Sequence, residues 1–332
     1  MSEPTKTPRL PWLSPSSSGL GSSGSTGLLS LRREGSGHEH ADHEHHDDGD
    51  DAYRLHRRFD RIGRLVGDPA MRKLLGSHVM VLGLGGVGSW AAEALARSGV
   101  GRLTLVDFDL VCVTNANRQL HAMRGTTGKP KATVMAERLQ AIHPTATIEA
   151  VRSFYEAETS EALLARKPDL IVDAIDNLTA KAHLIATCRE RGIPLVVSGG
   201  ASGRMDPTQI RVRDLSEIEG DPFLASLRKI LRRKHEFPTG RGWGIATVHS
   251  LEPAAAPVSL EYDAGEGFRC VCPQGDNGKH TCDARSLIYG TASFVTGSFG
   301  FACAAEAVRT LLQPEAPEAE PTPEFATSSG TK

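Results

Sequence analysis

A glycine-rich turn is the first feature of the sequence whose residue types and spacing could do chemistry. It lies between an apolar run at 78–83, which predicts a strand, and a run of helix-forming residues at 89–98. Glycines let the backbone approach a phosphate closely, and the N-terminus of the following helix supplies free N–H groups and the positive end of its dipole. The glycines together with Asp107 predict a nucleotide site, because an acid about 20 residues after such a turn can hold ribose hydroxyls. The glycines are Gly83, Gly85, Gly86 and Gly88.

The polar residues after the turn distinguish between ATP and a nicotinamide cofactor. Hydride transfer needs no fixed cation beyond the turn that holds the pyrophosphate. Nucleotidyl transfer does need one, because negative charge builds on the α-phosphate and on the departing pyrophosphate. Taken singly, these residues are better explained as strand-end acids, a surface ion pair or a first-turn helix residue, but together they favour nucleotidyl transfer. They stand in four stretches: Asp107-Phe-Asp109, Asn115-Ala-Asn117-Arg118-Gln119, Gly128-Lys129-Pro130-Lys131 and Asp173-Ala-Ile-Asp176-Asn177.

In this order and at these spacings, the motifs resemble the ThiF/MoeB/HesA superfamily of ubiquitin-activating-like adenylyltransferases over about residues 58–200. The resemblance implies a catalytic set in which Arg118 and Lys131 stabilise charge during attack on the α-phosphate and Asp176 binds Mg²⁺. It also implies a homodimer in which an N-terminal arginine, Arg61 or its neighbours at 58 and 64, reaches the phosphates of the other subunit. The residues it assigns to ATP are Gly83, Gly85, Gly86, Gly88, Asp107, Asp109, Asn115, Arg118, Lys131, Asp176, Asn177 and Arg61.

Further stretches resemble one family within this superfamily, the tRNA threonylcarbamoyladenosine dehydratases. They read VCVTNANRQLHAMRGTTGKPKATVMAERL, VSGGASGRMDPTQIRVRDLS and YGTASFVTGSFGFACAAEAV, and they extend the resemblance over most of 55–312. The resemblance implies that ATP activates the threonyl carboxylate of threonylcarbamoyladenosine next to the tRNA anticodon, and that the activated group cyclises with loss of AMP. The alternative is an adenylyltransferase that activates the C-terminus of a ubiquitin-like sulfur-carrier protein. Many such members hold zinc in paired CxxC motifs, which this sequence lacks.

Six cysteines in a chain of this length, without a signal peptide, do not suggest a secreted disulfide framework. Bacterial dehydratases carry a cysteine in the segment that reads GWGIATVHSLEP here, where Thr247 stands, so no nucleophilic thiol is expected at that position. A cysteine-desulfurase or sulfur-acceptor relay is a further partner to consider. Three cysteines form a cluster in the sequence: Cys270, Cys272 and Cys282. They could hold zinc, include a reactive thiol or lie reduced in a surface loop. The loop is favoured, because their spacing is not that of a standard zinc motif. The other three are predicted to be packing residues: Cys112, Cys188 and Cys303.

The elements that must position these residues alternate between strands and helices. Two short helices are predicted in 53–76, and residues 236–285 are too broken by Gly and Pro to assign. The order predicts a Rossmann-like, doubly wound, mainly parallel sheet of ThiF type with helices on both faces and a C-terminal α/β extension. Strands are expected at 78–83, 103–109, 146–151, 169–176, 194–200 and 209–215. Helices are expected at 89–98, 131–142, 160–166, 179–191, 221–235 and 291–312.

Composition divides the chain into a foldable centre and two tails. Residues 1–52, rich in His and acids, and residues 313–332 are predicted to be disordered, because neither can bury enough apolar surface to offset its ordering entropy. Residues 53–312 are predicted to form one adenylating domain, with the nucleotide motifs in 78–200 and a substrate- and tRNA-facing extension in 201–312.

The charge and hydropathy of the sequence indicate which classes of partner the protein could bind. The net charge is −2, but the two tails carry an acidic excess of five and three charges, which leaves about +6 for the centre. This suits a polyanionic partner, and the basic stretch 228–235 is either a site for tRNA phosphates or a solvated helix face. The uncharged stretch 287–305 contains three glycines and predicts a buried helix rather than a membrane span. We expect a cytoplasmic protein without a membrane partner.

Overall fold

The computed structural model describes residues 55–261 and 289–313 of the 332. These residues form a seven-stranded sheet with the order β3-β2-β1-β4-β5-β7-β6. Every neighbouring pair is parallel except β6 and β7, which are antiparallel. The strands are β1 (His78–Leu82), β2 (Arg102–Val106), β3 (Thr147–Val151), β4 (Leu170–Asp173), β5 (Leu195–Ser198), β6 (Ile210–Asp214) and β7 (Ala246–Ser250).

The central strands are uninterrupted apolar runs because both of their faces are buried. On β1, Val79 and Val81 pack in the core of one face, and Met80 and Leu82 pack in the core of the other. Successive side chains of a strand point to opposite faces, so one strand contributes to two cores. A parallel sheet covered on both sides therefore shows no polar alternation in its sequence.

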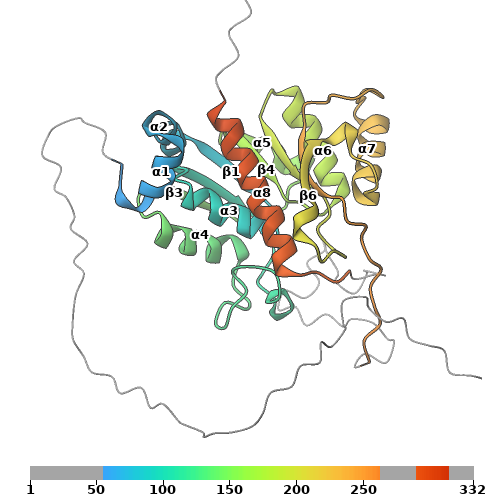
Figure 1. The fold of residues 1–332 in the computed structure, drawn as a ribbon, viewed down its shortest axis with the longest axis horizontal. Coiled ribbons are helices and arrows are strands. Elements are labelled where there is room, and N and C mark those ends of the chain that lie inside the picture. The colour runs from blue at the N-terminus through green and yellow to red at the C-terminus, as the bar shows by residue number, and fades with distance from the viewer. Residues whose placement is uncertain (1–54, 262–288, 314–332) are drawn as a thin grey trace, which may run out of the picture. The chain divides into compact units, whose positions relative to one another are not determined.

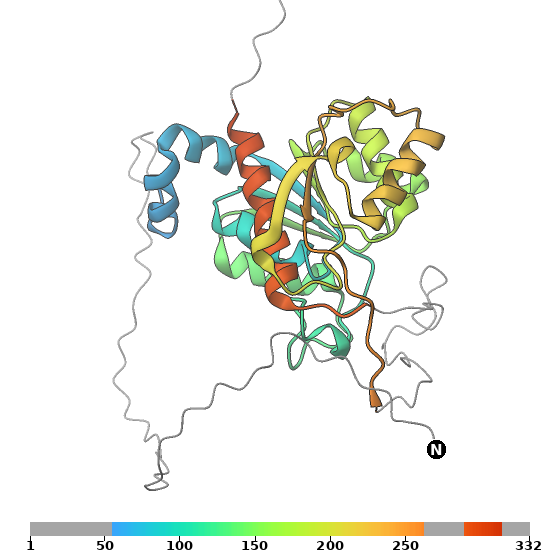
Figure 2. The same ribbon diagram turned by 45° about the vertical axis from the view of Figure 1, so that its right-hand side comes forward.

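Helices cover both faces of the sheet (Figures 1 and 2). One face carries α3 (Gly88–Arg97), α4 (Lys131–Ile142) and α8 (Ser293–Leu312), and the other carries α5 (Ala157–Leu164), α6 (Leu178–Glu190) and α7 (Pro222–Lys234). The predicted short N-terminal helices are α1 (Asp60–Val66) and α2 (Asp68–Gly76). The 3-10 helices are η1 (Arg57–Phe59), η2 (Val113–Asn115), η3 (Pro207–Gln209) and η4 (Leu215–Glu217).

The helix α8 lies across the sheet and packs closely on α3 (Figure 1). A Cβ atom at Gly300 would lie 2.6 Å from the carbonyl oxygen of Val87 and 2.7 Å from Cβ of Trp90, so the close approach requires glycine. The prediction of a buried helix in this apolar stretch is confirmed. Among the helices of the described residues, none combines the length and hydropathy that a membrane span requires.

The strand β7 is an element that the sequence did not reveal. It inserts between β5 and β6, and its side chains Thr247 and His249 are polar yet buried. The run ATVHS therefore lacks the apolar character of the other inner strands. The predicted tails, except Gln313, and the cysteine cluster at 270, 272 and 282 lie outside the described residues.

Candidate nucleotide-binding active site

A cavity of about 720 Å³ lies at the carboxyl ends of β2, β1, β4 and β5. The chain runs outward from β1 to β2 and β3, and then returns to the other side of β1 to form β4. Ligands of doubly wound folds bind outside the carboxyl ends of the strands at such a reversal. The cavity therefore occupies the place where the fold offers a binding crevice.

Most of the residues proposed from the sequence line this cavity. Gly88 does not, but a Cβ atom there would lie 1.8 Å from the carbonyl oxygen of Gly83, so it allows α3 to pack against the turn. Asn177 caps α6, since its Oδ1 accepts the N–H groups of Thr179 and Ala180 at 3.0 Å. Arg61 lies exposed on α1, away from the lining. The proposed residues that do line the cavity are Gly83, Gly85, Gly86, Asp107, Asp109, Asn115, Arg118, Lys131 and Asp176.

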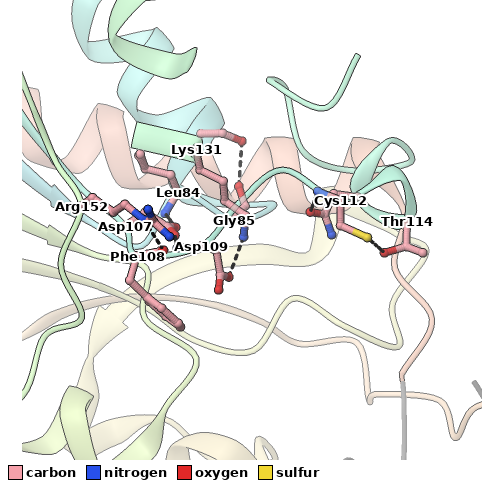
Figure 3. A network of polar contacts seen from close by, with 11 residues as sticks. Leu84, Gly85, Asp107, Phe108, Asp109, Cys112, Thr114, Lys131 and Arg152 are labelled. Atoms are coloured by element: carbon pink, nitrogen blue, oxygen red, sulfur yellow. Dashed lines mark hydrogen bonds and ion pairs between the residues drawn. The ribbon is translucent and has the colours of Figure 1, made fainter. Parts of the chain in front are cut away.

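Asp107 fixes the glycine turn from the end of the neighbouring strand (Figure 3). Its Oδ2 accepts the backbone N–H of Leu84 at 2.7 Å, and its Oδ1 accepts that of Asp109 at 2.8 Å. Burial raises the pKa of this carboxyl, although the nearby ammonium of Lys131 opposes the increase. Gly83 has a φ of +85°, a conformation that favours glycine. Asp107 and Gly83 together set the backbone path of the turn.

Lys131 places a positive charge in the wall of the cavity. It is the first residue of α4, its side chain is only 6% exposed, and its Nζ lies 2.8 Å from Oδ2 of Asp109. Burial lowers the pKa of Lys131, but the carboxylates of Asp107, Asp109 and Asp176 more than offset this effect and raise the pKa above its ordinary value. The ammonium is therefore kept charged where a phosphate could bind.

Arg118 supplies a second cation from the connection between β2 and α4. Its Nη1 donates to the carbonyl oxygen of Thr114 at 3.1 Å and to Oδ1 of Asn117 at 3.0 Å. Its own carbonyl oxygen accepts the indole N–H of Trp90 at 3.1 Å. Nearby, Oδ1 of Asn115 accepts the backbone N–H of Cys112 at 3.1 Å. Two fixed cations beside a glycine turn can bind a polyphosphate and stabilise charge that develops on it.

Several residues of the cavity wall are not among those predicted from the sequence. Gln119 is buried and lines the cavity with an Oε1 atom that has no hydrogen-bond partner. Its place beside Arg118 in a motif was the signal that could have identified it. Arg204 and Asp221 also line the cavity and form a buried ion pair at 3.1 Å. The Asp-Pro start of α7 marks Asp221 as a cap, whereas nothing local marks Arg204. The aromatic residues of the lining are Phe108, Phe154, Tyr155, Phe223 and Tyr289.

The described thiols are buried, as predicted for packing residues. Burial raises the pKa of Cys188 and of Cys303 to about 12. Thr247 is fully buried in β7, donates from Oγ1 to the carbonyl oxygen of Ile245 at 3.2 Å and does not line the cavity. Among the described residues there is no group of three or more side chains that could hold a metal ion by themselves.

The fold and this site define a protein of the Rossmann-like nucleotide-binding class that fixes two cations beside its glycine turn. The profile of the ThiF family matches residues 59–332. The tRNA threonylcarbamoyladenosine dehydratase of Escherichia coli is 41% identical over 266 residues, which cover 79% of this chain and 95% of the relative. That of Haemophilus influenzae is 40% identical over 259 residues, which cover 77% and 94%.

Among solved structures, the E. coli tRNA N6-threonylcarbamoyladenosine dehydratase in complex with ATP superposes with a TM-score of 0.66. It is 38% identical, and the match covers 76% of this chain and 93% of that one. The chain belongs to the ThiF family and, within it, to the tRNA threonylcarbamoyladenosine dehydratases. The expected fold class is therefore confirmed.

Proposed function

We propose that this protein catalyses the ATP-dependent dehydration of threonylcarbamoyladenosine next to the anticodon of tRNA. A carboxylate oxygen of the substrate attacks the α-phosphate of ATP, and pyrophosphate leaves. A nucleophilic atom of the substrate itself then attacks the activated acyl carbon, and AMP leaves with the former carboxylate oxygen. The observation that carries the proposal is a cavity joining the glycine turn to Arg118 and Lys131, in a chain 38% identical to a dehydratase solved with ATP.

The residues of the cavity divide the work of the first step. The glycine turn presents backbone N–H groups and the N-terminus of α3 to the phosphates. Arg118 and Lys131 stabilise the charge that builds on the α-phosphate during attack. Because Asp109 already holds the ammonium of Lys131 at 2.8 Å, this charge is in position before the nucleotide arrives. Asp107 stands where it can accept hydrogen bonds from the ribose hydroxyls.

Asp176 is the residue that we propose for Mg²⁺. It lies at the cavity wall after the end of β4, close enough to Lys131 to affect the pKa of that residue. A single carboxylate that acts together with nucleotide phosphates and water fits the ligand preference of Mg²⁺. When bound there, the ion would neutralise phosphate charge, as the two protein cations would also do.

A homodimer is a further part of the proposal. Arg61 is exposed on α1, where a second subunit could approach. Arg64 is the weaker candidate for reaching the phosphates of another subunit, because its Nε already donates to Oδ2 of Asp60 at 2.9 Å. A sulfur relay would need an accessible thiol. Cys112, Cys188 and Cys303 are buried, so that role would fall to the cysteines outside the described residues.

The C-terminal turns of α7 are the surface that we propose for the tRNA backbone. Lys229, Arg233 and Lys234 are exposed there. Arg232 lies over the ring of Trp243 at 5.3 Å, and Arg228 is partly buried and donates to the carbonyl oxygen of Leu215 at 3.4 Å. Lys229, Arg233 and Lys234 are therefore better placed to neutralise phosphates than the partly buried Arg228, whereas Arg232 is exposed but also contacts Trp243.

The test is incubation of the purified full-length protein with ATP, Mg²⁺ and tRNA that carries threonylcarbamoyladenosine, followed by mass analysis of gently digested nucleosides. A nucleoside lighter by one water, formed only with ATP, is the expected result. An unchanged nucleoside would refute the proposal. If AMP formed only when a small Gly-Gly-ended carrier protein was supplied, the carrier-activating alternative would replace it.

A further inference from the structure

The cavity extends well beyond the glycine turn. It follows the strand ends from β2 across β1 and β4 to β5. With neighbouring strands about 4.8 Å apart, these three steps span about 14 Å. The residues proposed for ATP follow β1, β2 and β4, and none of them comes from the β5 end. At that end the lining includes 198–202, Arg204 and 221–223.

A buried ion pair fixes the wall at the β5 end. Arg204 donates from Nη2 to Oδ2 of Asp221 at 3.1 Å and from Nε to the carbonyl oxygen of Glu252 at 2.9 Å. Asp221 accepts the backbone N–H of Leu224 at 3.0 Å through Oδ1 and so caps α7. The side chains of Arg204 and Asp221 are 3% and 2% exposed. The loop after β5 and the start of α7 are thus joined into one rigid unit.

Phe223 belongs to this unit and is half-buried in the cavity wall. At the opposite end, Phe108 follows Asp107 and meets Phe154 edge to face, with ring centroids 5.0 Å apart. The cavity therefore has an aromatic side chain at each end. Proteins that bind unpaired bases stack them on aromatic rings. If Asp107 and the glycine turn place ATP near Phe108, a second base would meet the β5 end, where the Arg204–Asp221 pair braces the start of α7 and the ring of Phe223 lines the wall.

The direction of α7 connects this end of the cavity with the basic surface. The helix begins at Pro222, in the lining, and ends at Lys234. Its 13 residues correspond to about 20 Å at 1.5 Å per residue. Measured along the helix axis, the exposed cations Lys229, Arg233 and Lys234 therefore lie about 9 to 17 Å from Phe223. A tRNA backbone that continued from the cavity along α7 would bring its phosphates close to those cations.

We propose that the β5–α7 end of the cavity is the subsite for the modified nucleoside of the tRNA, with the adenine base stacked on Phe223. The Arg204–Asp221 pair positions that ring. This inference rests on the proposed function, because it takes threonylcarbamoyladenosine as the second ligand. The substrate carboxylate then meets the α-phosphate in the middle of the cavity, between the two aromatic ends and beside Arg118.

The experiment compares three substitutions of phenylalanine to alanine in the full-length protein. Phe223→Ala should raise the KM for modified tRNA about tenfold, in the range expected for loss of one base–aromatic stack, and leave ATP binding unchanged. Phe108→Ala should weaken ATP binding. Phe294→Ala, on the exposed face of α8 and outside the lining, should change neither. Phe223→Trp should restore the KM for tRNA, which a merely destabilised protein would not do.

A binding measurement separates the failure of this inference from the failure of the proposed function. Equilibrium binding is measured for tRNA with and without the threonylcarbamoyl group. The wild type should prefer the modified tRNA, and Phe223→Ala should lose that preference while it still binds ATP. An intact preference in Phe223→Ala would overturn the subsite even if dehydration were observed. A wild type that shows the preference but forms no dehydrated nucleoside would overturn the function and retain the subsite.

Discussion

Asp109 and Lys131 are joined twice, once through side chains and once through the backbone. Nζ of Lys131 lies 2.8 Å from Oδ2 of Asp109, and the N–H of Lys131 donates to the carbonyl oxygen of Asp109 at 3.0 Å. These contacts close the long connection between β2 and α4, which carries Asn115 and Arg118. The position of the buried cation therefore depends on the same two residues that hold the connection in place.

Replacement of Lys131 by methionine should lower kcat for dehydration by on the order of 10²- to 10³-fold, because it removes a fixed charge from the α-phosphate. Lys129→Met is the matched control, since Lys129 is exposed in the same connection and does not line the cavity. Steady-state kinetics with modified tRNA provide the measurement. Turnover of Lys131→Met at the wild-type rate would remove Lys131 from the mechanism.

Replacement of Asp176 by asparagine should nearly abolish turnover and increase the Mg²⁺ concentration needed for the remaining activity. The amide keeps the size of the side chain but loses the negative charge that attracts the ion. Retention of modified tRNA should stay close to wild type, because the tRNA surface is proposed to lie along α7. A Mg²⁺ titration identical to that of the wild type would show that another group holds the ion.

His121 should make the stability of the protein sensitive to acid. It is fully buried with both ring nitrogens unpartnered, and burial, together with the charge of Lys131, lowers its pKa from 6.5 to about 3. The folded state therefore binds this proton more weakly than the unfolded chain. The contribution of His121 to stability is complete above pH 6.5 and decreases by about 1.4 kcal/mol per pH unit below it.

Urea unfolding of His121→Leu at pH 7 and at pH 5 tests this coupling. Between these values the wild type should lose about 2 kcal/mol more of its free energy of unfolding than the variant. The remaining histidines are common to both proteins, so their effects cancel in the comparison. Equal losses in the two proteins would mean that His121 binds its proton equally well in the folded and unfolded states.

Charge reversal at the end of α7 should weaken tRNA binding mainly at low salt. Lys229→Glu should reduce the slope of log K against log salt concentration by roughly one, as expected when a phosphate contact is removed. Lys73→Glu serves as the matched control, because Lys73 is exposed on α2, away from α7. If the two variants show the same salt dependence, the basic turns of α7 are a solvated surface.

Local signals in the sequence account for most of the elements that the structure contains. The helix at 131–142 has its predicted bounds, and His143-Pro144 was the signal for its end. The inner strands were found because burial on both faces makes them continuously apolar. β7 was missed because Thr247 and His249 are buried polar residues, and the sequence does not show that neighbouring strands enclose them.

The site was predictable where its residues form local motifs. The glycine turn, Asp107, Arg118 and Lys131 fall within short stretches, and the structure brings them into one cavity. The β5 end was missed because it depends on the ion pair between Arg204 and Asp221, which are 17 residues apart in the sequence. The fold of the loop after β5 and of α7 brings the two side chains together. Such a pair forms only in the folded chain, and no local spacing in the sequence predicts it.

The helix α8 has a consequence for how the protein is made. Thr296 of α8 lines the cavity, and a Cβ atom at Gly86 would lie 3.2 Å from Cβ of Thr296, so α8 packs closely against the glycine turn. Phe299, Cys303 and Ala307 complete the core on the same face. When only residues 1–288 have been synthesised, all the nucleotide motifs are therefore present. The part of the cavity wall that α8 provides is still missing. Nucleotide binding should therefore appear only after α8 has been synthesised and has packed against the glycine turn.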